Sequence, residues 1–281
     1  MDALDIRHVS HWFGDHQVLH DINLQIAAGQ IVAIVGPSGC GKSTLFRAIL
    51  GTHPTKAGEI YADGERIIGP SRRVGIVYQH YTLYEFLTAK QNVAFGLKMD
   101  QTSLPFRCFK FFQWQAKRRE HERLSAAFLD KVGLHASVEK YPIEMSGGMR
   151  QRVAIAQAMI MKPKVLLLDE PFGALDEATR SDLQKMLLHF YQENLAAKRN
   201  GEIPPYTIII VTHELNEAIY VSDRVIGLSQ YHQKDFKGST IVYDAPSPVF
   251  HPDDIRDFDR FIHQRDELRK VVFASDDDVN E

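Results

Sequence analysis

The chain has 281 residues, of which 44% are hydrophobic and 25% charged, so it can bury a sizeable core and is not a disordered protein. Its formal net charge is -3, from 33 Lys and Arg against 36 Asp and Glu. This excludes the basic balance of a protein that binds nucleic acid over its whole surface, and we expect no nucleic-acid partner. The two cysteines, Cys40 and Cys108, are too few for a disulfide framework.

No apolar run has the length of a membrane span. The longest runs, residues 31–35 and 165–168, are far shorter than the about 20 residues that a spanning helix needs. The N-terminal segment carries Asp2, Asp5 and Arg7 and has no apolar region typical of an export signal. We therefore expect a soluble protein of a reducing compartment, which reaches a membrane only through a partner.

Strand and helix patterns alternate in the first part of the chain. Residues 18–26 alternate apolar and polar side chains, which predicts a half-buried antiparallel strand. Residues 31–35 form a β-branched run typical of a buried central strand. A glycine-rich loop follows, and then a predicted helix over 42–50 that ends at Gly51. Further strands are predicted in a hairpin and beyond it, at residues 59–67 and 74–78.

The pattern changes between residues 88 and 158, where we see no clear strand and expect several helices. The α/β pattern then returns, with strands and helices predicted at 165–168, 177–195, 207–211, 214–221 and 224–228. The polar segment 198–205 contains two prolines and is predicted to be a surface loop. We expect an α/β core of residues 1–87 and 159–245, an inserted helical subdomain of residues 88–158, and a C-terminal helical extension with an acidic tail at 246–281.

The strongest motif is the glycine-rich loop. It fits G-x-x-x-x-G-K-[ST] and lies between a predicted buried strand and a helix, the context that indicates a phosphate-binding loop. Glycines let backbone N–H groups close around phosphate oxygens, and the helix N-terminus adds partial positive charge. Lys42 is suited to neutralise the β- and γ-phosphates, and the Ser43 hydroxyl to hold Mg²⁺. The residues expected to bind ATP here are Gly36, Pro37, Ser38, Gly39, Cys40, Gly41, Lys42, Ser43 and Thr44.

Two acids end the apolar run 165–168. A carboxylate at the tip of a strand beside a phosphate-binding loop can reach Mg²⁺, and Asp169 fits this role. Glu170 faces a different direction and is a candidate for polarising an attacking water. The alternative for this pair is an acidic turn at a strand end.

A further motif, Ser146-Gly147-Gly148-Met149, opens a predicted helix. Ser146 is the predicted N-cap, and the paired glycines allow the backbone to approach an anion closely. The alternative is an ordinary capped helix start. The glycines disfavour it, because each costs helix stability.

In this order the motifs resemble the ATP-binding cassette (ABC) family, over residues from about 4 to 228. Residues 36–44 match its Walker A motif, and Asp169 and Glu170 match its Walker B aspartate and catalytic glutamate. Ser146-Gly147-Gly148 matches its signature, normally LSGGQ. Here Met145 replaces the leucine and Met149 replaces the glutamine.

The resemblance assigns roles to residues that stand outside these motifs. Gln79 matches the glutamine that contacts Mg²⁺ and the attacking water, His213 the histidine that contacts the γ-phosphate, and Asp176 lies in the loop found at the dimer interface. The resemblance also implies an aromatic residue that stacks on adenine. Trp12 and Phe13 both qualify, and Phe13 is favoured because Gly14 follows it.

The resemblance implies a P-loop NTPase core with a mixed sheet and an N-terminal antiparallel β part. It further implies an ATPase with ATP and Mg²⁺ as cofactors, in a homodimer whose copies face each other head to tail. Separate transmembrane permease subunits and a periplasmic solute-binding protein are the implied partners, at the cytoplasmic face of the inner membrane. Four stretches are most similar to nitrate, sulfonate and taurine importers: residues 36–45, 92–97, 145–156 and 169–180. The alternative is the cassette of an exporter or a lipid-transport complex.

The stretch 105–123 is rich in aromatic and basic residues. On a helix Phe106, Phe109 and Phe112 share one face, and Phe111 and Trp114 lie on the side of the basic residues. In one interpretation the Phe stripe packs on the helical subdomain and the basic face is solvated. In the other, exposed aromatics and cations contact partner loops or lipid headgroups.

Overall fold

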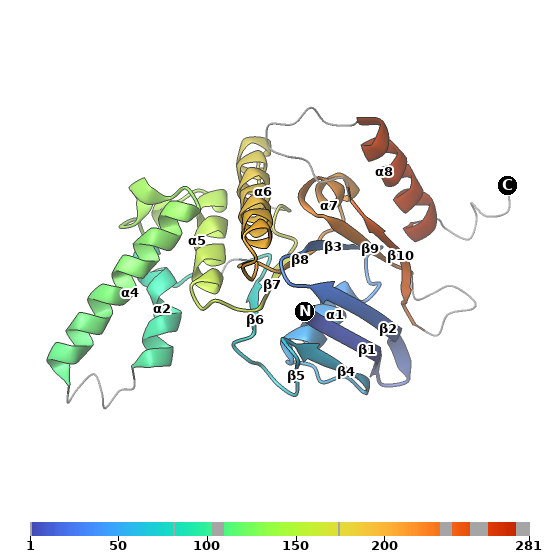
Figure 1. Cartoon of the computed structure of the whole chain (residues 1–281), viewed down its shortest axis with the longest axis horizontal. Coiled ribbons are helices and arrows are strands. Elements are labelled where there is room, and N and C mark those ends of the chain that lie inside the picture. The colour runs from blue at the N-terminus through green and yellow to red at the C-terminus, as the bar shows by residue number, and fades with distance from the viewer. Residues whose placement is uncertain are drawn as a thin grey trace.

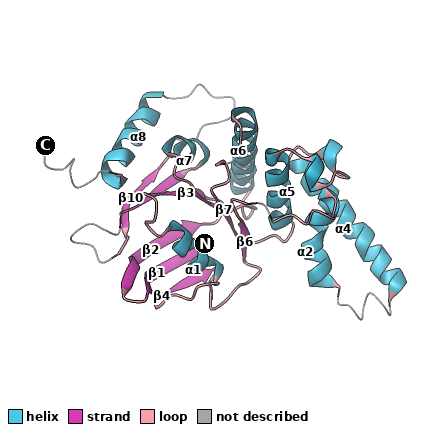
Figure 2. Ribbon diagram, turned by 180° about the vertical axis from the view of Figure 1, so that it is seen from behind, coloured by secondary structure: helices cyan, strands magenta, loops and turns pink. Residues whose placement is uncertain are grey.

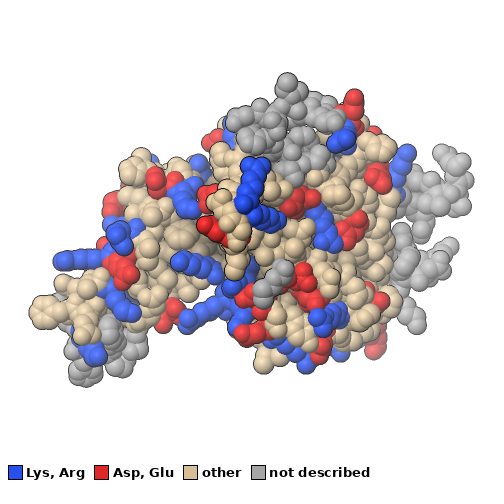
Figure 3. All heavy atoms as spheres, viewed as in Figure 1, with Lys and Arg blue, Asp and Glu red and all other residues tan. Residues whose placement is uncertain are grey.

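The computed structural model describes residues 2–80, 82–102, 110–173, 175–230, 238–247 and 258–273. Two sheets lie next to each other, and a group of helices extends to one side of them (Figure 1). Lys and Arg side chains alternate with Asp and Glu over the face seen in Figure 3, in keeping with the small net charge. Among the described helices, none is long and apolar enough to cross a membrane.

The first sheet is antiparallel, with strand order β2-β1-β4-β5. Its strands are β1 (Asp2–Phe13), β2 (His16–Ala27), β4 (Ala57–Ala62) and β5 (Glu65–Arg66). The predicted hairpin is confirmed: Asp63 and Gly64 both have positive φ, at 51° and 77°, as a two-residue turn of this kind requires.

Strand β1 has no counterpart among the predicted strands. Its pairing with β2 shifts register several times, and His8 has a φ of 51°. These irregularities break the two-residue alternation by which a half-buried strand is recognised in a sequence. The N-terminal segment therefore contributes a full strand to the core without showing its pattern.

The second sheet is mixed, with strand order β10-β9-β3-β8-β7-β6. All neighbours pair in parallel except β10, which is antiparallel to β9. Its strands are β3 (Ile31–Val35), β6 (Val74–Val77), β7 (Val165–Asp169), β8 (Ile208–Val211), β9 (Arg224–Leu228) and β10 (Ile241–Pro246). The predicted strands of this sheet are confirmed, and β10 is an addition to them.

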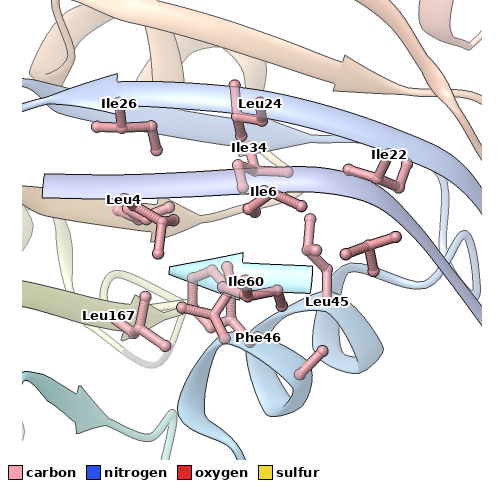
Figure 4. Packing of buried hydrophobic residues seen from close by; sticks show 14 of the residues in the cluster. Leu4, Ile6, Ile22, Leu24, Ile26, Ile34, Leu45, Phe46, Ile60 and Leu167 are labelled. Carbon is pink, nitrogen blue, oxygen red and sulfur yellow. The ribbon is translucent and has the colours of Figure 1, made fainter. Parts of the chain in front are cut away.

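Both faces of the mixed sheet are covered. Helix α1 (Lys42–Leu50) packs between the two sheets, where Leu45 and Phe46 meet Ile34 of β3 and the apolar side chains of β1 and β2 (Figure 4). On the opposite face lie α6 (Glu177–Arg199), α7 (Leu215–Val221) and α8 (Phe258–Val272) (Figures 1 and 2). Side chains of β3 alternate between the two layers, Ile34 toward α1 and Val35 toward α7 and α8.

The part of residues 88–158 that the structure describes is helical and contains no strand, as predicted. It holds α2 (Ala89–Gln101), α4 (Phe111–Lys131) and α5, which continues to Met159 (Gly147–Met159), with two short 3₁₀ turns at His135–Ser137 and Pro142–Glu144. Thr88 and Gln91 form a capping box at the start of α2, which satisfies two backbone N–H groups.

The interpretation in which the Phe stripe packs on the helical subdomain is wrong for Phe112, the member of the stripe that the structure describes. Residues 105–109 lie outside the described residues, and α4 begins at Phe111. Phe112 is 86% exposed instead of packed, whereas Trp114 is half-buried and lines a cavity of about 240 Å³ between α2 and α4. The orientation of the helix therefore differs from our expectation: its Trp114 side, and not Phe112, faces the cavity beside α2.

Segment 198–205 is a loop only in part, because α6 continues to Arg199. The buried side chains of Asn194 and Ala197 hold this last turn of the helix. Asn194 donates hydrogen bonds to the carbonyls of Gly29 and Tyr206 and accepts one from the Tyr206 N–H. These bonds fasten the loop that follows.

The packing of α8 on β9 leaves no room for a side chain at Gly227. A Cβ there would lie 2.3 Å from Cγ2 of Val272 and 2.9 Å from Cβ of Tyr243. We expect Gly227→Ala to lower the free energy of unfolding by about 1–3 kcal/mol, because overpacking displaces α8. Urea denaturation measures this loss. Gly69→Ala, which places a Cβ in open space, is the control, and equal effects of the two changes would contradict the packing argument.

Candidate nucleotide-binding site

The glycine-rich loop connects the end of β3 to α1. Gly39 and Gly41 have φ of 82° and 98°, values that only glycine adopts without strain. Gly41 is the N-cap of α1 and makes no side-chain cap, so the first N–H groups of the helix face the loop without a capping partner. This is the arrangement that binds a phosphate group.

The Lys42 side chain lies inside the loop and binds its backbone. The residue is 8% exposed, and its ammonium donates hydrogen bonds to the carbonyl oxygens of Gly36, at 2.7 Å, and Pro37, at 2.9 Å. A cation is thus held at the centre of the loop. Cys40 is fully buried in the core beside α1, where burial raises the pKa of its thiol. Its side chain therefore belongs to the core and not to the phosphate-binding surface.

The two acids of the second motif lie at the end of β7. Asp169 pairs with Val211 of β8, and the next N–H, that of Glu170, donates to the Val211 carbonyl. Burial, and next the charge of Glu170, raise the pKa of the Asp169 carboxyl. Glu170 has a φ of 45°, a left-handed conformation that costs about 1–3 kcal/mol for a residue other than glycine.

Three segments far apart in the sequence meet at Glu170. The Gln79 side chain donates a hydrogen bond to Oε2 at 3.1 Å, and Nδ1 of His213 lies 3.4 Å from Oε1. Gln79 follows β6 and His213 follows β8, so each comes from the carboxyl end of a parallel strand. The structure therefore brings together three of the residues that the sequence analysis selected.

The signature residues lie at a second position, where α5 and α6 begin. Ser146 caps α5 and accepts from the Met149 N–H, and Asp176 caps α6 through bonds from the Thr179 N–H and hydroxyl. A Cβ on Gly148 would lie 1.7 Å from Cγ2 of Thr179. The glycine is thus required for the approach of the two helices, a reason that the sequence analysis did not find. Thr179 lies outside every motif, so no sequence signal pointed to it.

Phe13 ends β1 immediately before Gly14, whose φ of 59° forms the turn into β2. The Phe13 side chain is 48% exposed, whereas Trp12 is only partly exposed. The residues that follow the turn reach the phosphate loop: a Cβ on Gly41 would lie 2.8 Å from Leu19 and 2.9 Å from Val18. Of the two aromatic candidates, Phe13 has the more accessible ring.

The residues present suit Mg²⁺ held together with phosphate. Ser43, Gln79 and Asp169 supply a hydroxyl, an amide oxygen and a carboxylate, the hard oxygen ligands that Mg²⁺ takes. Within the described residues no group of three or more His, Cys, Asp or Glu side chains could hold a metal ion alone. That agrees with Mg²⁺ chemistry, in which one or two protein oxygens are completed by substrate phosphates and water.

Comparisons with known proteins identify the family of this chain. Residues 19–173, more than half of the chain, match the family described as ABC transporter. A sulfate/thiosulfate import ATP-binding protein of Gloeobacter violaceus is 40% identical over 248 residues, which are 87% of this chain and 65% of that protein. The chain thus spans less than two thirds of that relative. An aliphatic sulfonates import ATP-binding protein of Bacillus cereus is 40% identical over 231 residues, 81% of each protein.

Two solved structures have the same fold. One is cbiO1 from Clostridium perfringens, part of the ABC transporter complex cbiONQ, with a TM-score of 0.70, 25% identity and coverage of 96% of this chain and 94% of that one. The other is a dimeric post-hydrolysis state of the ATP-binding cassette MJ0796 bound to ADP and Pi, with a TM-score of 0.66, 26% identity and coverage of 88% and 100%. The chain belongs to the ABC transporter family, whose ATP-binding cassettes are ATPases.

The contact between Gly148 and Thr179 can be tested by a double-mutant cycle. We expect Gly148→Ala to destabilise the protein by about 1–3 kcal/mol, because the new Cβ overlaps the Thr179 methyl group. Thr179→Ser removes that methyl and keeps the hydroxyl that caps α6 through Asp176, so it should recover much of the loss. Urea denaturation of the two single variants and the double variant measures the coupling. An equal cost of Gly148→Ala with and without Thr179→Ser would contradict the assignment.

Proposed function

We propose that this chain is the ATP-hydrolysing subunit of an importer and works as a homodimer around two ATP molecules. In this proposal residues 1–87 and 159–245 form the ATP-binding core, residues 88–158 the helical signature subdomain, and residues 246–281 the C-terminal extension. The observation that carries it is the contact of Glu170 with Gln79 and His213 beside a phosphate-binding loop. A lone carboxylate at a strand end would not explain why two other segments converge on it.

Each residue of the site has a part in the proposed hydrolysis. The P-loop backbone, Lys42 and the start of α1 bind the phosphates, and Phe13 stacks on adenine. Glu170 accepts the proton of the attacking water, and Gln79 and His213 hold its carboxylate in orientation. Ser43, Asp169 and Gln79 would hold Mg²⁺, which would supply positive charge against the charge that develops on the phosphates. Positioning and electrostatics carry most of the rate enhancement in such a transfer.

The second group of residues, at the starts of α5 and α6, acts on the other copy in this proposal. Ser146, Gly147, Gly148 and Met149 present helix N–H groups, which favour an anion, to the ATP that is bound by the partner's P-loop. Asp176 lies beside them at the dimer contact. The dimeric cassette with ADP and Pi among the similar structures supports this arrangement. ATP then stabilises the closed dimer, because it contacts both copies only in that state.

The transported solute is an oxyanion of the sulfate or sulfonate class in our proposal. The similar proteins named for sulfate/thiosulfate import and for aliphatic sulfonates import, at 40% identity each, support this class. The chain would associate peripherally with separate permease subunits at the cytoplasmic face of the inner membrane. A periplasmic solute-binding protein would deliver the oxyanion.

The role of Glu170 is tested by Glu170→Gln. The amide has nearly the same shape but cannot accept a proton, so we expect turnover to fall by about 10²- to 10⁴-fold while ATP affinity is retained. Steady-state phosphate release and calorimetric titration with ATP give the two values. Asp182→Asn, a similar loss of charge on the outer part of α6, is the control. Wild-type turnover in Glu170→Gln would remove the basis of the proposed mechanism.

The proposed dimer is tested at Ser146. Ser146→Arg introduces a bulky cation where the partner's phosphates should lie, so we expect hydrolysis to fall at least about 100-fold while each monomer still binds ATP. Light scattering with ATP, on the Glu170→Gln background, should detect a dimer only without Ser146→Arg. Ser146→Thr preserves the N-cap and should behave like the unaltered chain. A loss of ATP binding by the Ser146→Arg monomer would instead place this residue at the nucleotide of its own copy.

A further inference from the structure

The Phe13 ring is packed against two imidazole rings. His11 precedes it on β1, and His53 follows the end of α1. Ring centroids are 4.9 Å apart for His11 and Phe13, 6.3 Å for His53 and Phe13, and 6.4 Å for the two imidazoles, all in edge-to-face geometry. Contacts of this geometry fix the orientation of a ring. The two imidazoles thus restrain the Phe13 ring, while Phe13 remains 48% exposed to solvent.

Each of the two imidazoles has a buried ring nitrogen without a hydrogen-bond partner among the described residues. His11 is 4% exposed, and Nδ1 of both His11 and His53 is buried without a hydrogen-bond partner in the described part of the chain. A neutral imidazole tolerates this, since one of its nitrogens carries no proton. A protonated imidazole has two N–H donors and a charge, and a buried charge without a partner is costly. The packed cluster therefore requires a neutral His11, which is almost fully buried.

The charges around the cluster act in the same direction. Burial, and next the proximity of His53 and Lys56, lower the pKa of His11. Lys56 immediately precedes β4, whose first residue, Ala57, pairs with Ser10 of β1. No carboxylate contributes to the shift of the His11 pKa. A proton on His11 is therefore opposed by burial and by the positive charge of Lys56.

We propose that His11 and His53 are positioning residues for Phe13, and that protonation of His11 makes the affinity of this chain for adenine nucleotides decrease as the pH falls. The packed rings fix Phe13 in the orientation that stacks on adenine. Protonation of His11 separates the rings and releases Phe13. This inference rests on the proposed function, in which Phe13 stacks on adenine.

The sign and size of the effect follow from linkage between proton binding and ring packing. Because packing disfavours the protonated form, the packed cluster predominates above the ordinary histidine pKa of about 6.5 and is lost below it. Stacking of a base on an aromatic ring is worth about 1–3 kcal/mol. The loss of a contact within this range lowers the affinity for the nucleotide about tenfold. The phosphate-binding loop should not share this dependence, since it contains neither histidine.

The experiment compares two ligands on the full chain, with Mg²⁺ present. A non-hydrolysable ATP analogue reports the base and the phosphates, whereas inorganic tripolyphosphate reports the phosphates alone. Calorimetric Kd values are measured between about pH 8 and pH 5.5, on either side of the histidine pKa. Because protonation of the two ligands themselves also changes over this range, the pH dependence is judged against variants that are measured with the same two ligands. We expect the ratio of analogue Kd to tripolyphosphate Kd to rise about tenfold toward the acidic end.

Variants at His11 separate positioning from general stability. His11→Phe keeps an aromatic edge against Phe13 but cannot take up a proton, so the ratio should rise by less than about threefold over the same range. His11→Gln, also unable to titrate in this range, serves if the larger ring disturbs folding. His189→Phe, the same change at an exposed position of α6, is the matched control and should keep the full dependence.

The outcomes distinguish this inference from the function on which it rests. Tight binding of both ligands with a ratio that is constant with pH, or that responds equally in His11→Phe and His189→Phe, would overturn the positioning role and leave the ATPase proposal intact. A folded chain that binds neither ligand at about pH 8, where histidine is neutral, would refute the nucleotide site itself and this inference with it. A pH-dependent ratio that His11→Phe flattens supports the proposal.

Discussion

The parallel pairing of β7, β8 and β3 determines where every loop of the site lies. Because the three strands run in the same direction, the P-loop, Glu170 and His213 leave the sheet at one edge. All residues of β3 and β8 are buried, and a slip of one residue would exchange the side chains of the two hydrophobic layers. By contrast the contact of His213 with Glu170 is half-exposed, and pairs of this kind contribute about 0–1 kcal/mol. Core packing therefore fixes the site, and its polar contacts adjust to it.

The sequence predicted best those elements whose signals are local and strong. The buried runs 31–35 and 224–228 and the helix at 42–50 coincide with β3, β9 and α1, because apolar runs and a terminal glycine define their limits. Strand β1 could not be predicted, since a left-handed residue and repeated register shifts remove its alternation. The orientation of α4 also failed, because which of its aromatics meets α2 depends on how two helices pack and not on the pattern of one.

For the candidate site, the sequence supplied the chemical groups but not their neighbours. A match to ordered motifs selects Gln79 and Glu170, yet their contact joins positions 91 residues apart and follows only from strand order. Gly148 was interpreted as an opening for an anion, and the structure adds a steric reason, namely the methyl group of Thr179. The two reasons are compatible. A glycine that lets α5 approach α6 also aligns their N-termini, so Ser146 and Asp176 are held in one rigid unit.

Two contacts within the chain occupy the groups that a nucleotide needs. Lys42 donates to carbonyl oxygens of its own loop, and Gln79 donates to Glu170. A phosphate offers Lys42 a charged acceptor, and hydrogen bonds between charged partners are roughly twice as strong as neutral ones. In the proposed function the lysine would exchange its carbonyls for phosphate at a net gain, without leaving the loop. The amide oxygen of Gln79 is not used in its bond to Glu170, so in that proposal the same side chain would hold the carboxylate and contact Mg²⁺. The arrangement is thus preorganised for the nucleotide, and binding requires local exchanges of hydrogen bonds instead of a rearrangement of the core.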